Sequence, residues 1–295
     1  MQKSEMLEQI QNGKGFIAAL DQSGGSTPKA LAGYGVAPDA FSNDDEMFAL
    51  IHDMRVRIMM SDAFCGERVI GAILFEKTMD GIADGQPVPA YLQSQGVVPF
   101  LKVDKGLEDE ADGVQMMKPI GGLEELLARA ATLGVFGTKM RSVINLASPS
   151  GIAAIVKQQF EVAGQIIGCG MMPMIEPEIS IGSPQRAAAD QILLAELLKA
   201  LDVLPDGHKV MLKLTLPVIA GTFAPLVDHA NVVRVVALSG GFSRTDACAE
   251  LAKNRGVIAS FSRALLAELR HPMSDAEFNA SLDTAITEIH HASIA

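Results

Sequence analysis

The feature that most constrains the fold of this chain is a series of eight short apolar runs, separated by segments of helical periodicity. Parallel strands covered on both faces read as nearly continuous apolar runs. Strands that alternate with helices build βα units, and eight such units predict a parallel eight-stranded (β/α)8 barrel with extra N- and C-terminal helices. The runs lie at 15–21, 69–76, 97–104, 135–144, 171–179, 209–217, 232–239 and 257–262.

The segments between the runs predict the helices of the barrel. A doubly wound open sheet is the alternative fold, but no Gly-x-Gly-x-x-Gly turn follows the first run. No linker-like stretch divides the chain, so we expect one domain over residues 1–295. Serines at helix starts accept N–H hydrogen bonds, which makes Ser183 and Ser274 candidate N-caps. The expected helices are 3–12, 39–60, 87–95, 122–134, 149–168, 183–204, 225–230, 243–254, 264–270 and 274–292.

The amino-acid composition of the chain limits the kinds of molecule that it is expected to bind. The 295 residues are 48% hydrophobic and carry a net charge of −11, which disfavours nucleic acid and anionic membranes as partners. A small anionic substrate would therefore need a local basic cluster. The three cysteines are far apart and odd in number, and the N-terminus lacks an apolar signal core. These features predict a cytoplasmic protein.

Lys213 is the most unusual residue of the apolar runs, because leucines flank it on both sides. A lysine in such a strand is paired, functional, or at a wet strand end. Burial or a nearby cation lowers a lysine pKa, and only the neutral amine attacks a carbonyl. The two interpretations are a structural ion pair and a nucleophile.

The spacing of polar residues favours the second interpretation. Four of them recur every 37 residues near the carboxyl ends of consecutive runs, and each has a polar partner two residues later. Residues i and i+2 share one face of a strand, so the four pairs would point into one pocket at the face where barrel active sites lie. The alternative is an internal layer of salt bridges. The pairs are Lys102–Asp104, Lys139–Arg141, Glu176–Glu178 and Lys213–Thr215.

This set of residues suits imine chemistry. Lys139 would lie next to Lys213 and lower its pKa by charge repulsion. Glu176 would carry the protons that carbinolamine formation and dehydration require. Asp21, at the end of the first run, would take or orient a hydroxyl proton.

Two stretches suggest phosphate sites. Ser239, Gly240 and Gly241 open a helix after the seventh run, and Arg263 follows the eighth. Loops after strands seven and eight commonly form the phosphate site of such barrels. The segment 23–26, Ser-Gly-Gly-Ser, would cradle a second phosphate with Lys102 and Arg141, or else form a simple glycine-rich turn.

A zinc site is not expected. None of the six histidines lies within a predicted strand, and no His-x-x-x-His pair occurs. We therefore expect no metal and no other cofactor.

Seven motifs together resemble class I fructose-1,6-bisphosphate aldolase, and most closely its shorter bacterial form. The resemblance runs from about residue 15 to 270. The motifs are Ala-Leu-Asp-Gln-Ser (19–23), Leu-Lys-Val-Asp-Lys-Gly (101–106), Thr-Lys-Met-Arg (138–141), Ile-Glu-Pro-Glu-Ile (175–179), Leu-Lys (212–213), Leu-Ser-Gly-Gly (238–241) and Ser-Phe-Ser-Arg-Ala-Leu (260–265).

The resemblance implies a metal-independent barrel enzyme of glycolysis and gluconeogenesis. It would cleave fructose 1,6-bisphosphate reversibly to dihydroxyacetone phosphate and glyceraldehyde 3-phosphate. Lys213 matches the Schiff-base lysine and Glu176 the acid/base residue, with Asp21, Lys139 and Glu178 as catalytic support. One phosphate site would comprise Ser239, Gly240, Gly241 and Arg263, and the other Lys102, Arg141, Ser23 and Ser26.

Two positions depart from the animal members of that family. Ser262 stands where they have glycine, before the phosphate-binding arginine. They also end in a tyrosine implicated in enamine protonation, whereas the only tyrosines here are Tyr34 and Tyr91. The alternatives for function are another Schiff-base aldolase or transaldolase acting on a phosphorylated sugar, and a non-catalytic barrel scaffold. A homo-oligomer is possible.

Overall fold

A computed structural model describes residues 1–295, and it confirms the parallel barrel. Eight strands are hydrogen-bonded side by side in the order β1-β2-β5-β7-β8-β9-β10-β11, and every pair along this path is parallel. The barrel strands are β1 (Phe16–Leu20), β2 (Val69–Leu74), β5 (Val98–Lys102), β7 (Gly137–Ile144), β8 (Met172–Ile179), β9 (Val210–Thr215), β10 (Val232–Leu238) and β11 (Ile258–Ala259).

The first and last strands meet at a seam. The backbone N–H of Ala19 in β1 donates to the carbonyl of Phe261, just past β11, at 3.1 Å. Strand β11 is shorter than the predicted 257–262, because only Ile258 and Ala259 pair with β10. Backbone hydrogen bonds still hold Ser260 and Phe261, and the chain then enters the mouth of the barrel at Ser262 and Arg263.

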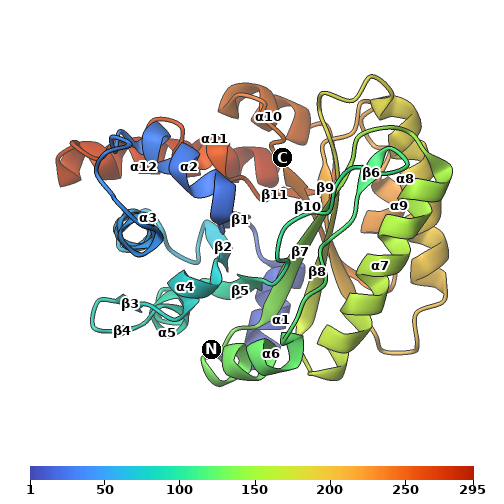
Figure 1. The fold of residues 1–295 in the computed structure, drawn as a ribbon, viewed down its shortest axis with the longest axis horizontal. Helices are drawn as coiled ribbons and strands as arrows, with labels where there is room; N and C mark the ends of the chain where they lie inside the picture. The colour runs from blue at the N-terminus through green and yellow to red at the C-terminus, as the bar shows by residue number, and fades with distance from the viewer.

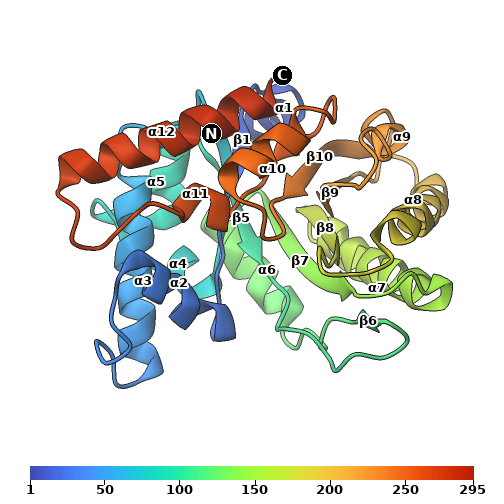
Figure 2. The same ribbon diagram turned by 90° about the horizontal axis from the view of Figure 1, so that it is seen from above.

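Helices cover the outside of the barrel, as Figures 1 and 2 show from two directions. Helices follow the barrel strands along the chain, as predicted, and they range from a single turn to 20 residues. None of them is long and apolar enough to cross a membrane. The helices are α1 (Lys3–Asn12), η1 (Gly24–Ser26), α2 (Thr27–Tyr34), α3 (Asp44–Met59), α4 (Glu76–Met79), α5 (Val88–Ser94), α6 (Leu123–Thr132), α7 (Pro149–Gly168), α8 (Arg186–Asp202), α9 (Ala224–Val227), α10 (Arg244–Leu251), α11 (Arg263–Leu266) and α12 (Asp275–Ser293).

Two hydrophobic cores follow from the alternation of side chains along the strands. On β9, Leu212 and Leu214 belong to the large core between strands and helices, whereas Met211 belongs to a smaller core with Val98 and Met174. Met6 and Ile10 of α1 pack into this smaller core. Because i and i+2 share a face, Lys213 lies on the same side as Met211. The barrel interior is therefore apolar at the level of Met211 and charged one pleat higher.

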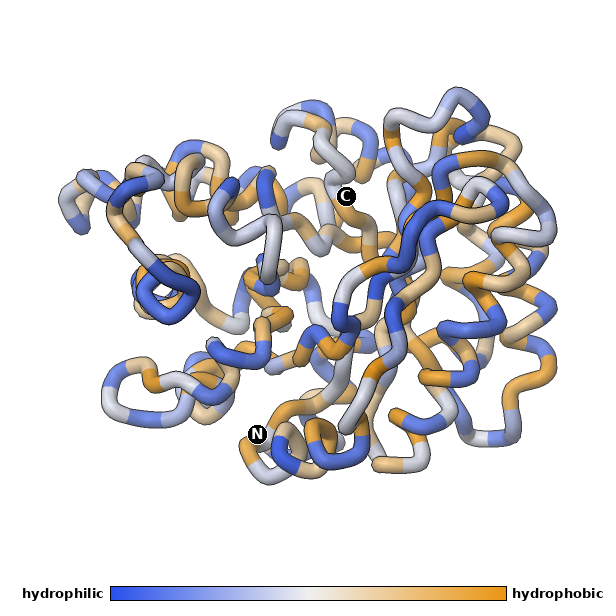
Figure 3. The backbone as a smooth tube through the Cα atoms, viewed as in Figure 1, coloured by the Kyte–Doolittle hydropathy of each residue, from blue (hydrophilic) through white to orange (hydrophobic).

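The connection from β5 to β6 (Val114–Gln115) is a hydrophilic stretch, blue in Figure 3. Strand β6 pairs antiparallel with β7, outside the barrel path. A two-stranded hairpin, β3 (Ile82–Ala83) and β4 (Gln86–Pro87), turns at Asp84 and Gly85, which both have positive φ. Neither feature was predicted.

Some helix boundaries differ from the predictions. Helix α2 was missed, and the helix predicted to start at residue 39 starts after Asn43, whose side chain accepts the N–H of Glu46 at 3.0 Å. The prediction that Ser183 caps α8 was wrong. Its hydroxyl accepts the N–H of Gln185 within a turn, and Gln185 is the N-cap. Ser274 caps α12 as predicted.

Candidate active site

A cavity of about 820 Å³ opens at the carboxyl ends of the barrel strands. Residues from the ends of β1, β5, β7, β8, β9, β10 and β11 line it. It brings together every predicted catalytic and phosphate-binding residue except Gly241. These residues are Asp21, Ser23, Ser26, Lys102, Lys139, Arg141, Glu176, Glu178, Lys213, Ser239, Gly240 and Arg263.

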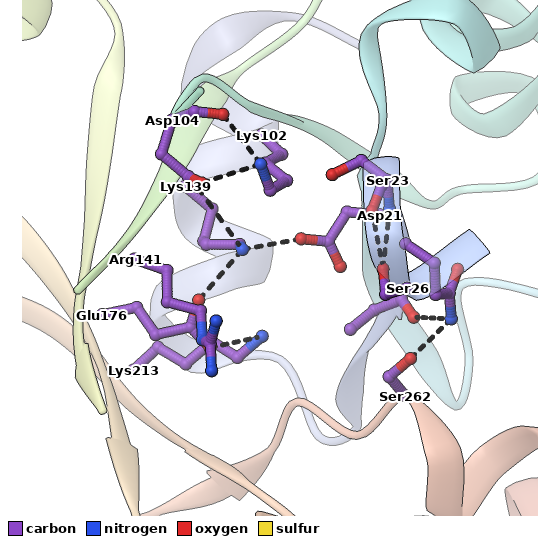
Figure 4. A network of polar contacts seen from close by, with 12 residues as sticks. Asp21, Ser23, Ser26, Lys102, Asp104, Lys139, Arg141, Glu176, Lys213 and Ser262 are labelled. Atoms are coloured by element: carbon purple, nitrogen blue, oxygen red, sulfur yellow. Dashed lines mark hydrogen bonds and ion pairs between the residues drawn. The ribbon is translucent and has the colours of Figure 1, made fainter. Parts of the chain in front are cut away.

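The floor of the cavity is a chain of alternating charges (Figure 4). Lys213 Nζ lies 3.1 Å from Glu176 Oε1, and Lys139 Nζ lies 3.0 Å from Glu176 Oε2. Lys139 Nζ also lies 2.7 Å from Asp21 Oδ2. At most 5% of the side chains of Lys213, Glu176 and Lys139 is exposed. These groups, on the neighbouring strands β7, β8 and β9 and at the end of β1, therefore form one connected network.

Lys139 was predicted to lie directly beside Lys213, and the network places Glu176 between them. The strand order explains this, since β8 separates β7 from β9. The two ammonium groups bind opposite oxygens of one carboxylate. Glu176 therefore balances both cations and can exchange a proton with Lys213 directly.

Charge pairing outweighs burial for three groups in this network. Burial alone would raise the pKa of Asp21 and Glu176, but Lys139 and Lys213 hold both below their ordinary values. Burial alone would lower the pKa of Lys139, but Asp21, Glu176 and Asp104 raise it. At neutral pH the two carboxyl groups are therefore ionised and Lys139 is protonated.

Two further ion pairs lie nearer the mouth of the cavity. Lys102 Nζ lies 2.7 Å from Asp104 Oδ1, and Arg141 Nε lies 2.5 Å from Glu178 Oε2. The prediction that Thr215 points into the pocket with Lys213 was wrong, because Thr215 does not line the cavity. Its hydroxyl instead donates to the carbonyl of Ile179 at 2.7 Å and ties β9 to β8.

The loops after β10 and β11 converge. Gly240 and Gly241 have φ of 60° and 124°, a region that favours glycine. A Cβ on Gly241 would stand 3.6 Å from a guanidinium nitrogen of Arg263, so this backbone lies against the arginine. Arg263 forms no ion pair within the chain. Its charge is available to an anion in the cavity.

The Ser-Gly-Gly-Ser segment is a turn that also lines the cavity. The Ser26 hydroxyl donates to the Ser23 carbonyl at 2.9 Å and accepts the Ser23 N–H at 3.0 Å. This closes the single 3-10 turn η1. The segment is therefore a regular turn that faces the site opposite Lys102, and its role as a phosphate cradle stays a prediction.

Sequence reasoning missed two polar residues that support the site. The buried Gln159 of α7 accepts the backbone N–H of Glu176 at 2.9 Å and donates to Ser142 of β7 at 3.0 Å. Gln22 lines the cavity beside Asp21. Glutamine carries no pattern that separates such a contact from a surface position, so nothing in the sequence signals either role.

The structure contains no group of three His, Cys, Asp or Glu side chains placed to hold a metal ion. The carboxylates of the cavity instead face lysine or arginine.

Comparison with known proteins agrees with this geometry. The family model described as "Fructose-bisphosphate aldolase class-I" matches residues 3–220. A curated relative from Synechocystis sp., "Fructose-bisphosphate aldolase class 1", is 55% identical over 291 residues, covering 98% of this chain and 97% of its own. The chain belongs to the class I fructose-bisphosphate aldolase family. Members of this family are lyases, and the resemblance seen in the sequence is confirmed.

Solved structures support the same fold. Fructose-bisphosphate aldolase from Plasmodium falciparum, solved in complex with TRAP and a small-molecule inhibitor, superposes with a TM-score of 0.79 at 22% identity. That match covers 99% of this chain and 93% of the other. A protein from Corynebacterium glutamicum superposes with a TM-score of 0.57 at 14% identity, covering 98% and 93%. At these identities the likeness concerns the fold alone.

Proposed function

We propose that this class I aldolase cleaves fructose 1,6-bisphosphate reversibly through a Schiff base on Lys213. The observation that carries the proposal is the 3.1 Å contact between Lys213 Nζ and Glu176 Oε1 on the cavity floor. An amine must lose a proton before it attacks the ketone. A carboxylate within hydrogen-bond distance is suited to accept it.

Glu176 then serves as the proton shuttle of imine formation. The Lys213 nitrogen bonds to the substrate C2 as the C2–O π bond breaks, and a proton passes from that nitrogen to the oxygen, which becomes a hydroxyl. Glu176 returns a proton to that hydroxyl, which leaves as water and yields the protonated imine. Lys139 supports this cycle because it stays protonated and pairs with Glu176 through the other oxygen.

Asp21 serves as the base for bond cleavage in this proposal. Its ionised carboxylate takes the C4 hydroxyl proton, the C3–C4 bond breaks, and its electrons pass to the iminium nitrogen. Glyceraldehyde 3-phosphate leaves and an enamine remains on Lys213. Protonation at C3 and hydrolysis of the imine then release dihydroxyacetone phosphate and restore the amine.

Two cationic ends of the cavity suit a bisphosphate. Arg263 has no internal counterion and lies against the Ser239–Gly241 loop, so it is suited to a strong, charge-assisted contact with phosphate. Lys102 and Arg141, with Ser23 and Ser26, would hold the other phosphate. Both of these cations already face a carboxylate, Asp104 or Glu178. Glu178 supports the chemistry by orienting Arg141.

The substrate class also bears on partners and location. A sugar phosphate of glycolysis is consistent with the cytoplasm predicted from the cysteines, all three of which are free. A homo-oligomer and the cytoplasmic location are proposals that sedimentation and fractionation would test.

Borohydride trapping tests the proposal. Sodium borohydride with dihydroxyacetone phosphate should reduce the imine, inactivate the enzyme and add the mass of the reduced adduct to the peptide that contains Lys213. Borohydride without the ketone is the control and should leave activity intact. A label confined to another lysine, or no label, would overturn the assignment of Lys213.

Chelation tests the metal-free part of the proposal. We expect full cleavage activity after exhaustive treatment with EDTA, because the cavity carboxylates pair with cationic side chains and no ligand group of three forms. Activity that disappears on chelation and returns with zinc would contradict it.

A further inference from the structure

A polar relay crosses the seam between the first and last barrel strands. It joins Arg55 of α3, Gln22 after β1 and Ser262 after β11. The proposed chemistry uses none of these three side chains. Gln22 and Ser262 nevertheless both line the cavity, and Ser262 immediately precedes Arg263.

Arg55 is the largest fully buried side chain of the molecule, with 0% exposure. Of the two terminal guanidinium nitrogens, Nη1 donates to Thr78 Oγ1 at 2.7 Å, and Nη2 donates to the Gln22 carbonyl at 2.5 Å and to Gln22 Oε1 at 3.2 Å. A buried cation is costly unless its donors are used. Here they fix both the backbone and the side-chain amide of a residue in the cavity wall.

The orientation of the Gln22 amide follows from this contact. Arginine can only donate, so the Gln22 oxygen must face Arg55 and the NH2 group must face away. That NH2 group lies 2.6 Å from Ser262 Oγ. An amide nitrogen can only donate, so Ser262 Oγ accepts, and the serine's own hydroxyl proton points elsewhere.

Because Ser262 lines the cavity, an anion bound there is an acceptor that this proton can reach. Ser262 lies on the side of the network that holds Ser23 and Ser26 (Figure 4). The next residue carries the uncompensated guanidinium that lies against the Gly241 backbone. An anion held by Arg263 would meet an oriented O–H donor from the neighbouring residue.

We propose that Gln22, oriented by Arg55, is a positioning residue that turns the Ser262 hydroxyl toward the phosphate bound by Arg263. The inference rests on the proposed function, since it needs a phosphorylated substrate in this cavity. It assigns Ser262 a direct phosphate contact and gives Gln22 an indirect role through Ser262.

Steady-state kinetics of four variants test the relay. Ser262→Ala removes the donor, and Ser262→Thr keeps a hydroxyl. Gln22→Met keeps the size of the side chain without its amide, and the double variant combines Gln22→Met with Ser262→Ala. A hydrogen bond to a charged group supports an expected rise in KM for fructose 1,6-bisphosphate of about 10-fold in Ser262→Ala. We expect a smaller rise in Gln22→Met, with kcat changed less than KM in both.

Non-additivity is the decisive result. If Gln22 acts through Ser262, the double variant should be no worse than Ser262→Ala alone, and Ser262→Thr should stay close to the wild type. Effects that multiply in the double variant, or an unchanged KM in Ser262→Ala, would overturn the relay. If Gln22→Met fails to fold, as judged from its unfolding temperature, the comparison of Ser262→Ala with Ser262→Thr still decides the serine contact.

Monophosphorylated substrates provide a second readout, which a merely structural role would not move. Fructose 1-phosphate and fructose 6-phosphate each lack one phosphate. The monophosphate that is insensitive to Arg263→Ala should be equally insensitive to Ser262→Ala. Sensitivity of that same substrate to Ser262→Ala would count against a shared phosphate.

The failure of this inference can be told from failure of the proposed function. Trapping of wild-type Lys213 by borohydride depends on the amine and not on Ser262. A trapped, active wild type with additive variants would refute the relay alone. A wild type that neither cleaves the bisphosphate nor forms the adduct would refute the proposed function, and the relay with it.

Discussion

The two sides of the cavity differ in how the charges of their side chains are arranged. On β7, β8 and β9, and on Asp21 at the end of β1, four groups alternate in charge and neutralise one another. At the seam between β11 and β1, Arg263 forms no ion pair and lies near the backbone of Gly241, and the neighbouring Ser262 bonds to the neutral amide of Gln22.

In the proposed function, this difference lets a barrel of net charge −11 both react with an anion and bind it. A network in which positive and negative side chains neutralise one another fixes their protonation states and has little attraction for a charged ligand. Such a network suits proton transfer. A cation that has no counterion and lies among neutral donors keeps its full attraction for an anionic ligand, so it suits binding. Substitutions on the two sides should therefore have different effects.

Lys213→Arg should have the largest effect. A guanidinium remains protonated and cannot serve as the nucleophile, so we expect kcat to fall by about 10⁴-fold or more, as when a nucleophile is removed from a catalytic set. Cleavage assays and borohydride trapping would measure this. Lys199→Arg, on the exposed face of α8, is the matched control and should be silent. Substantial cleavage by the Lys213 variant would refute the Schiff base.

Glu176→Gln should come second. The amide keeps the size of the side chain but loses the ability to carry a proton between Lys213 and the carbinolamine. General acid–base groups contribute about 10²- to 10⁴-fold, and we expect kcat to fall within that range. Rapid-quench measurement of imine formation would locate the loss at that step. A variant that forms the imine at the wild-type rate would assign the shuttle to another group.

Arg263→Ala should act on binding, in contrast to these two. A charge-assisted contact is worth roughly 1.5–3 kcal/mol, so kcat/KM for fructose 1,6-bisphosphate should fall by about 10- to 150-fold. Imine trapping at saturating substrate should persist. Arg255→Ala, which removes an exposed arginine after α10, is the matched control. An unchanged kcat/KM in Arg263→Ala would show that this side does not hold phosphate.

The two sides of the cavity differ in how well the sequence predicted them. Local sequence patterns predict the side on β7, β8 and β9, whereas contacts between residues far apart in the chain build the other. The lysine, arginine and glutamate positions were predictable because strand ends and a period of two place them without knowledge of packing. Short apolar runs ending in charged residues occur seldom by chance. The order of the charges was not predictable in detail, and Lys139 proved to be separated from Lys213 by Glu176.

The seam was less predictable because its contacts join residues far apart in the chain. Gln22 and Ser262 are 240 positions apart, and Arg55 lies in a helix where arginine is usually exposed. The missed hairpin is a different case. Asp84-Gly85 is a recognised two-residue turn signal, so β3 and β4 could have been predicted locally.

The smallest expected effect concerns stability, and it separates the two sides by pH. Asp21→Asn removes a carboxylate 2.7 Å from the buried Lys139 ammonium, which we expect to lower the free energy of unfolding by about 1–3 kcal/mol at pH 7. The folded-state pKa of Asp21 lies below its ordinary value of 3.8. Its contribution is therefore complete above pH 3.8 and is lost as the pH falls toward the folded-state pKa.

Urea unfolding of the wild type and Asp21→Asn at pH 7 and pH 3 would measure this loss. The difference between the two proteins should be smaller at pH 3 by about 1 kcal/mol, since one unit of pH below the unfolded-state pKa is worth up to ~1.4 kcal/mol. Ser262→Ala is the counterpart from the seam, where the serine contact joins two neutral groups. Its stability difference should be the same at both pH values. A pH-independent difference for Asp21→Asn would mean that the Lys139 pair does not hold the network together, and the contrast between a charged side and a neutral seam would fail.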